Sequence, residues 1–164
     1  MGLFDKLFKG KKDAITLGAP VKGKAVPLSE VKDPTFGEEI LGKGVAIQPE
    51  GTKICSPCDG VVDLMFDTGH AVNLRSTEGV EILIHVGLDT VSLKGEGFKT
   101  FKKSDESVKK GDLLIEFDKE FLLSKGFDVI VPVVICNTDE YKEVAALTGK
   151  DVEVGDAVIE ITKE

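Results

Sequence analysis

The chain has 164 residues, of which 41% are hydrophobic and 30% charged, and its formal net charge is −8. This length and composition are typical of one folded domain with a core of its own. The acidic balance argues against a nucleic-acid partner, because a protein that binds a duplex carries a basic face. No stretch is apolar for long enough to span a bilayer, and the first twelve residues lack the features of a signal peptide. Since three cysteines do not make a disulfide framework, we expect a cytoplasmic protein with reduced thiols.

The N-terminal residues differ in composition from the rest of the chain. We predict a flexible amphipathic segment over residues 1–14, followed by a single domain over residues 15–164. A short basic amphipathic segment can lie on an anionic membrane surface, which would place the protein peripherally at the inner face of the membrane. A frayed, solvated terminus explains residues 1–12 equally well. The apolar face and the lysines of this segment are Leu3, Phe4, Leu7, Phe8, Lys6, Lys9, Lys11 and Lys12.

The domain itself is predicted to be all-β, with short helices only. Glycines and prolines separate short runs of Val, Ile, Leu and Phe, a spacing typical of a sandwich or barrel. Two short helices are predicted, one from Asp118 to just before Gly126 and one from Asn137 or Thr138 through Leu147, each with a capping residue in front and a glycine behind. The predicted strands, in chain order, cover residues 45–47, 60–62, 80–86, 113–117, 129–135 and 157–161.

Two short sequence motifs each occur twice. A strand that begins at a proline and contains a glycine recurs at residues 19–26 and 56–62, and a V-x-x-G-D turn entering a strand recurs at residues 108–116 and 152–160. Such short turn-and-strand motifs can recur by chance in β proteins. Two copies of each nevertheless favour a duplicated hybrid motif that closes on itself as a sandwich.

The only two histidines lie in one predicted hairpin, with residues 71–75 and 80–85 as strands and residues 76–79 as the turn. If the hairpin is centred between Thr77 and Glu78, His70 lies directly opposite His85, with the Cβ atoms about 5 Å apart. Alternation then places Thr68 on the face of His70 and sends Ile82 and Ile84 to the core. We therefore expect the two imidazoles to share one site.

Two neutral imidazoles allow several chemistries. They fall short of the three or four ligands of a usual zinc site, and no serine or cysteine nucleophile accompanies them in sequence. They do suit phosphoryl transfer, in which one nitrogen attacks phosphorus and the other ring donates a hydrogen bond to the phosphoryl oxygens. Since no nucleotide-binding loop is present, ATP bound to this chain would not be the donor.

At these residues the chain closely resembles the glucose-class enzyme IIA of the bacterial phosphoenolpyruvate-dependent sugar phosphotransferase system. The long stretch 79–91 around His85 carries most of the resemblance and continues through residues 93–98. Shorter matches complete a similarity that runs from about Ile15 to Ile161, and they lie at residues 44–49, 57–60, 108–112 and 131–135 and at Asn137.

The resemblance implies a duplicated β-sandwich and a role for each matching residue. His85 would accept a phosphoryl group on Nε2 from the histidine phosphocarrier protein HPr and pass it to a cysteine of the IIB domain of a sugar permease. His70 would stabilise the phosphoryl group, and Thr68 would orient His70. The chain would thus be an enzyme, a phosphotransferase component with a phosphohistidine intermediate.

The family docks its partners on a shallow apolar depression around the histidines. The residues that match this rim are Phe36, Ile40, Leu41, Val45, Phe66 and Val91, and the nearby carboxylates are Asp33 and Asp89. No cofactor is required, although His70 and His85 would form a partial zinc site that a partner's carboxylate could complete. Regulatory proteins are further candidates for the same face, and the sequence does not say which sugar is transported.

Three alternatives remain at this point. Cys55 and Cys58 form a C-x-x-C pair, but it lies at a proline-led strand turn and not at the helix start that activates a thiol. A zinc-dependent hydrolase of similar β architecture would need a third histidine or another strong ligand. A biotinyl or lipoyl carrier would present a lysine in its hairpin turn, where this chain has Ser76 to Gly79.

Overall fold

A computed structural model describes residues 14–164 of the chain. Residues 1–13 of the predicted amphipathic segment, for which membrane binding and a solvated terminus are both open, lie outside the described residues. Ala14, the last residue assigned to that segment, already begins the first strand. None of the helices within residues 14–164 is long and apolar enough to cross a membrane. The strands are β1 (Ala14–Gly18), β2 (Gly23–Pro27), β3 (Lys43–Pro49), β4 (Lys53–Cys55), β5 (Gly60–Met65), β6 (Ala71–Ser76), β7 (Glu81–His85), β8 (Phe98–Thr100), β9 (Ser107–Val108), β10 (Leu113–Phe117), β11 (Val131–Ile135), β12 (Glu143–Ala146), β13 (Lys150–Val152) and β14 (Ala157–Thr162).

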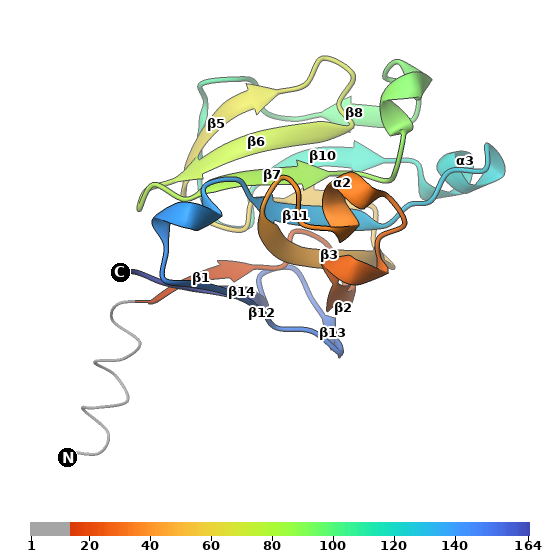
Figure 1. The fold of residues 1–164 in the computed structure, drawn as a ribbon. Helices are drawn as coiled ribbons and strands as arrows, with labels where there is room; N and C mark the ends of the chain where they lie inside the picture. Colours follow the sequence, from red (N-terminus) through yellow and green to blue (C-terminus); the bar gives the residue numbers. More distant parts are fainter. Residues whose placement is uncertain (1–13) are drawn as a thin grey trace.

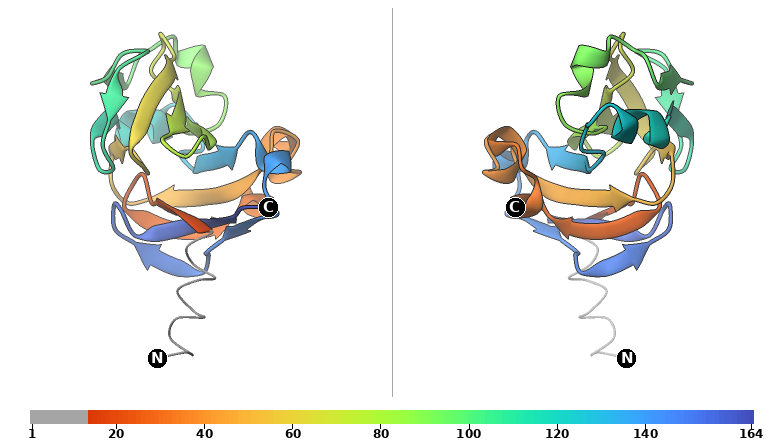
Figure 2. Two further views of the ribbon diagram at one scale, coloured as in Figure 1. Left: turned by 90° about the vertical axis from the view of Figure 1, so that its left-hand side faces the viewer. Right: turned by 90° about the vertical axis from the view of Figure 1, so that its right-hand side faces the viewer.

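These strands form three antiparallel sheets, which confirms the predicted all-β architecture (Figure 1). One large sheet has the order β13-β2-β3-β11-β7-β6-β5-β9, and two three-stranded sheets have the orders β1-β14-β12 and β4-β10-β8. The strands from the two ends of the chain gather in one half of the molecule, and the middle of the chain forms the other half (Figure 2). All six predicted strands coincide with observed ones, namely β3, β5, β7, β10, β11 and β14.

The sequence repeat is a structural repeat, held by equivalent hydrogen bonds. In the first copy the Ser56 N–H donates to Asp112 O at 2.8 Å, and in the second the Ala19 N–H donates to Asp156 O at 2.7 Å. Within each turn the aspartate accepts from the backbone N–H three residues earlier, at 2.9 Å in both copies. The glycine of each turn has φ +93°, a conformation that glycine adopts without strain. The V-x-x-G-D motif therefore forms the same turn in both copies.

The two copies also bond to each other reciprocally. The Gly18 N–H donates to Pro57 O, and the Cys55 N–H donates to Pro20 O, at 3.0 and 2.7 Å. Pro20 and Pro57 are the equivalent prolines of the repeat. This exchange of bonds is what a duplicated motif closing on itself predicts, so the duplication is confirmed.

One predicted helix is confirmed and the other is wrong. α3 (Lys119–Ser124) begins after Asp118, whose side chain accepts from the Phe121 N–H as a capping residue does. The second predicted helix is only a 3₁₀ turn, Thr138–Glu140, followed by strand β12. β12 pairs with β14, and this pairing buries Val144 in the core. The free energy gained by pairing and burial outweighs the weak intrinsic helix propensity of this segment.

A smaller apolar cluster on the outer face of the large sheet holds the segment that leads into the site. Consecutive residues of β3 point to opposite faces, so Val45 enters the main core while Ala46 faces the second cluster. Phe36, on the short helix α2 (Pro34–Gly37), packs into this second cluster. Its other members are Val26, Leu28, Val31, Leu88, Ile130 and Val134. Because the sheet is covered on both faces there, β11 is buried along its whole length.

Candidate phosphoryl-transfer site

The hairpin of β6 and β7 forms as predicted, but its register differs by one residue. Ala71, and not His70, lies opposite His85. The loop has three residues, because the Ser76 N–H donates to Val80 O and Gly79 takes φ +93°. A three-residue hairpin loop commonly places glycine in this left-handed position, so Gly79 was the signal for the true register. Asn137 fixes the loop by accepting from the Glu81 N–H and donating to Gly79 O, both at 3.0 Å.

The two imidazoles nevertheless share one site, as predicted. Their ring centroids are 5.0 Å apart, with the planes at 79°. His70 lies just before β6, after a tight turn in which Gly69 has φ +69°, so the alternation of side chains along a strand does not apply to it. Its carbonyl still accepts from the Val86 N–H at 2.7 Å, which ties the turn to the end of β7. The inference of a shared site holds, although the opposed-pair geometry behind it is wrong.

One hydrogen bond of the His85 ring determines which ring nitrogen carries the lone pair. Its Nδ1 lies 2.7 Å from Gly87 O. A carbonyl only accepts, so the proton is on Nδ1, and Nε2 carries the lone pair. The ring is half-buried, and burial is the largest cause that lowers the pKa of His85 below its ordinary value. His85 therefore presents a neutral Nε2, the form that a nucleophile requires.

His70 is almost completely buried, at 5% exposure. Burial, with a smaller contribution from the His85 charge, lowers the pKa of His70 to about 4, so this ring is also neutral near pH 7. The Thr68 hydroxyl lies within hydrogen-bond distance of His70 Nδ1. When Thr68 donates to Nδ1, the proton of His70 is on Nε2, which becomes a hydrogen-bond donor. The site then has a lone pair on His85 Nε2 and a hydrogen-bond donor on His70 Nε2.

Two carboxylates influence His85. Asp33 caps α2 by accepting from the Thr35 N–H, and Asp89 is exposed at a left-handed position with φ +59°. Both favour the charged imidazole and so act to raise the pKa of His85, but less than burial lowers it. Toward a phosphoryl group on Nε2 the same negative charges are repulsive.

The predicted apolar rim divides into buried and exposed residues. Phe36 and Val45 are buried, at 5% and 0% exposure, so they are not contact residues of an exposed rim. Phe36 is buried because it fills the second cluster, and Val45 because it lies in the centre of β3. Phe66 is half-buried, edge-on to His70 at 5.3 Å. The exposed members are Ile40, Leu41 and Val91, at 69%, 40% and 54%.

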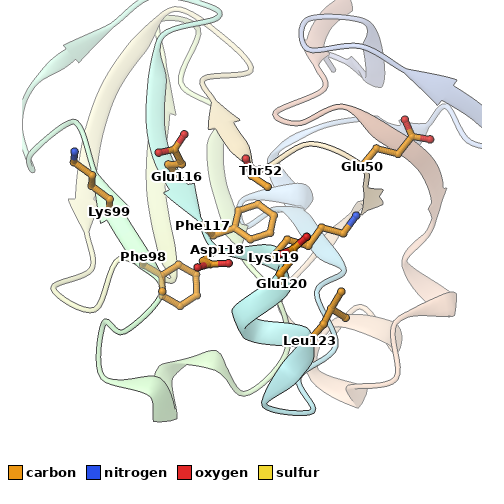
Figure 3. Close-up of a pocket in the computed structure, with 11 residues that line it drawn as sticks. Glu50, Thr52, Phe98, Lys99, Glu116, Phe117, Asp118, Lys119, Glu120 and Leu123 are labelled. Carbon is orange, nitrogen blue, oxygen red and sulfur yellow. The ribbon is translucent and has the colours of Figure 1, made fainter.

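A concavity of the described surface lies away from the two histidines. A depression of about 850 Å³ lies between β8, β10 and α3, and its lining includes Glu116, Asp118 and Leu123 but neither histidine (Figure 3). The two histidines therefore lie outside this concavity.

The alternatives from the sequence find no support in the geometry. Within residues 14–164 no group of three or more His, Cys, Asp and Glu side chains is arranged to hold a metal ion, so a zinc hydrolase lacks its third ligand. Cys55 and Cys58 are free and buried, and burial raises the pKa of the Cys58 thiol to about 11, opposite to the shift of a reactive cysteine. The hairpin turn carries no lysine for a biotinyl or lipoyl group.

Sequence reasoning did not identify the Gly87 carbonyl as part of the site. Gly87 has φ +74°, and a Cβ added there would lie 2.7 Å from Asp128 O. The available signal was the glycine two residues after His85, since glycine is the residue for a positive φ and for close backbone approach.

Comparisons with known proteins agree with this geometry. The sequence model of the family described as "phosphoenolpyruvate-dependent sugar phosphotransferase system, EIIA 1" matches residues 15–141. The chain is 44% identical, over 97% of both chains, to the glucose-specific EIIA component of the phosphotransferase system of Haemophilus influenzae. It is 45% identical to part of the glucose-specific EIIBCA component of Corynebacterium glutamicum, with 90% of this chain matching 22% of that protein.

A solved structure has the same fold. The glucose permease IIA from Mycoplasma capricolum superposes with a TM-score of 0.84 and 36% identity, covering 90% of this chain and 95% of that one. The family match, the full-length relatives and this structure point to the same assignment. The chain belongs to the EIIA family of the phosphoenolpyruvate-dependent sugar phosphotransferase system, in its glucose class, and is a phosphotransferase component that carries phosphoryl groups for sugar transport.

Proposed function

We propose that His85 Nε2 is the atom that carries the phosphoryl group, that His70 stabilises this group, and that Thr68 orients His70. The observation that carries the proposal is the hydrogen bond from His85 Nδ1 to Gly87 O, beside a second neutral imidazole 5.0 Å away. Phosphorylated HPr is the donor, and a cysteine of the IIB domain of a sugar permease is the acceptor. We place this exchange in the cytoplasm.

In the first step the Nε2 lone pair of His85 attacks phosphorus. An N–P bond forms as the N–P bond to the histidine of HPr breaks, and that histidine keeps the electron pair. His70 Nε2–H donates to the phosphoryl oxygens, where charge develops during transfer. In the second step a cysteine thiolate of the IIB domain attacks phosphorus, and the electron pair of the N–P bond returns to His85 Nε2.

The charges around His85 favour onward transfer. Asp33 and Asp89 repel the phosphoryl dianion and raise the free energy of the phosphorylated state relative to the free one. A carrier needs this property, because a phosphoryl group held too tightly would not leave.

We assign partner docking to three exposed apolar residues: Ile40 and Leu41, which follow α2, and Val91, two residues after Asp89. Exposed apolar side chains next to a reactive group are the usual centre of a protein–protein contact. The match to the Corynebacterium protein, whose name joins the B, C and A components, supports a IIB domain as one partner.

The test is phosphorylation by radiolabelled phosphoenolpyruvate with enzyme I and HPr, followed by transfer to a IIB domain. His85→Ala should accept no label. His70→Ala should accept label at His85 but pass it on at least tenfold more slowly. The labelled product should be acid-labile and base-stable, as an N–P bond is. Full labelling of His85→Ala, or an acid-stable adduct, would contradict the assignment.

Zinc at this site would require a different proton arrangement. Both rings would have to offer Nε2 lone pairs, with Thr68 accepting from His70 Nδ1–H, and a partner's carboxylate would have to complete the ligand set. The test is to measure zinc binding to the protein alone, and to measure the affinity of the protein for each partner with and without zinc.

A further inference from the structure

The Gly87 carbonyl, which sets the tautomer of His85, belongs to a loop with two successive hydrogen-bonded peptide units. In each unit both the carbonyl and the N–H form a hydrogen bond. In the unit between Gly87 and Leu88, the carbonyl accepts from His85 Nδ1 and the N–H donates to Asp128 O at 3.0 Å. In the preceding unit, the Gly87 N–H donates to Ile130 O at 2.9 Å, and the Val86 carbonyl accepts from the Thr90 hydroxyl at 2.5 Å. The direction of the Gly87 carbonyl depends on all four bonds.

Two of these four bonds are made by side chains, one by His85 and one by Thr90. The bonds to Ile130 and Asp128 join backbone to backbone. Thr90 is completely buried, at 0% exposure, so no water competes for the Val86 carbonyl. A Cβ added to Gly87 would lie 2.8 Å from Thr90 Cγ2, so the threonine methyl also packs closely against the glycine.

We propose that Thr90 is a positioning residue for phosphoryl transfer: its hydroxyl holds the loop so that the Gly87 carbonyl keeps the proton of His85 on Nδ1 and the lone pair on Nε2. This inference rests on the proposed function of His85. Without the hydroxyl, the Val86 carbonyl is buried without a donor, and the peptide units 86–88 turn away from their present orientation. The neutral His85 ring then populates both tautomers, and the Nδ1 tautomer with the free Nε2 lone pair is no longer the dominant one.

Substitutions of Thr90 separate the hydroxyl from the methyl. Thr90→Val keeps the methyl and removes the O–H, whereas Thr90→Ser keeps the O–H and removes the methyl. The first measurement needs no partner. In ¹⁵N NMR spectra at pH 7.5, wild type and Thr90→Ser should show a protonated Nδ1 and an unprotonated Nε2 for His85, and Thr90→Val should show averaged nitrogen shifts. His70 serves as an internal control, because its tautomer is set by Thr68.

The second measurement is the rate of labelling by phosphorylated HPr. For Thr90→Val, kcat should fall at least tenfold with KM unchanged, and Thr90→Ser should retain most of the wild-type kcat. If Thr90→Val does not fold, Thr90→Ser and Thr90→Ala form the decisive pair, since they differ only in the hydroxyl. An unchanged His85 tautomer and an unchanged kcat in the folded variant without the hydroxyl would overturn the proposal.

The two proposals fail in different ways. If wild-type protein is not labelled at His85, the proposed function fails, while the tautomer spectra still decide the role of Thr90. If wild type is labelled at His85 and the tautomer is insensitive to Thr90, only the positioning role fails.

Discussion

The ring of Phe36 lies against the imidazole of His85, with the centroids 5.1 Å apart and the planes tilted at 53°. Phe36 is at the same time a member of the second apolar cluster, so one side chain both anchors α2 to the sheet and shields His85 from water. Burial is the main cause of the lowered pKa of His85. The neutral state of the proposed nucleophile is therefore coupled to the packing of α2.

Phe36→Ala should consequently act on stability and on the ionisation of His85 together. We expect the free energy of unfolding to fall by about 3 kcal/mol, as for other large buried aromatic residues, and the pKa of His85 to return toward its ordinary value. Urea unfolding and an NMR titration of the ring protons measure the two effects. Phe36→Leu is the matched control, with a loss of about 1 kcal/mol expected. A stable Phe36→Ala protein with an unchanged His85 titration would contradict the coupling.

The exposed apolar residues should behave in the opposite way. Ile40→Ser and Val91→Ser change side chains that are 69% and 54% exposed, so the free energy of unfolding should change by less than about 0.5 kcal/mol. In steady-state labelling, KM for phosphorylated HPr should rise several-fold with little change in kcat, because docking and not chemistry is affected.

Leu123→Ser is the control for these variants. Leu123 is 51% exposed, but it lines the concavity beside α3 that contains neither histidine (Figure 3). Its substitution should leave KM unchanged. An equal rise of KM for Leu123→Ser would mean that any lost apolar surface weakens docking, and the assignment of Ile40 and Val91 would fail.

The pairing of the two histidines could be predicted from the sequence, but its geometry could not. Both residues flank one hairpin, and a hairpin brings its two ends together for any plausible register. The register itself depends on whether the loop has two or three residues, and Gly79 at a positive φ decides for three. His70 itself lies outside the strand, after the turn at Gly69, so no alternation pattern shows how its ring is oriented toward His85.

Burial at the rim was the least predictable feature of the site. The resemblance assigned Phe36 and Ile40 to one apolar surface, yet α2 turns the first inward and leaves the second exposed. Two apolar residues four positions apart in a short loop carry no periodic signal that separates them. Val45 is similar, since a continuous apolar run such as residues 45–47 does not reveal that both faces of β3 are covered.

The buried histidine predicts a particular dependence of stability on pH. The pKa of His70 is about 4 in the folded protein and about 6.5 in the unfolded chain. Between these values the unfolded chain binds the additional proton, so the free energy of unfolding falls as the pH is lowered from about 6.5 toward 4, by up to about 3 kcal/mol from this residue. The contribution is fully present above pH 6.5.

Urea unfolding at pH 7, 5.5 and 4 tests this dependence, with His70→Gln as the comparison. Glutamine does not ionise, so the variant should lose less stability than wild type over this interval. Protonation of carboxylates is common to both proteins and cancels in the difference. Parallel pH profiles for wild type and His70→Gln would show that His70 titrates normally in the folded state.

The duplication predicts equal energetic costs at two sites far apart in the sequence. Gly111 and Gly155 occupy equivalent turns, each with φ +93°, and a Cβ added to either meets no atom closer than 4.0 Å. Alanine at either position therefore costs only backbone strain, about 1 kcal/mol, and the two costs should be equal within about 0.5 kcal/mol and additive in the double variant. Gly51→Ala is the matched control, because Gly51 lies in a bend between β3 and β4 and has no positive φ, and a Cβ added there would lie 3.5 Å from its nearest neighbour, Lys22 Cβ. Chemical unfolding of the wild type and the four variants measures these differences. A cost at one glycine more than twice that at the other would show that the two copies have diverged in energy while keeping the same hydrogen bonds.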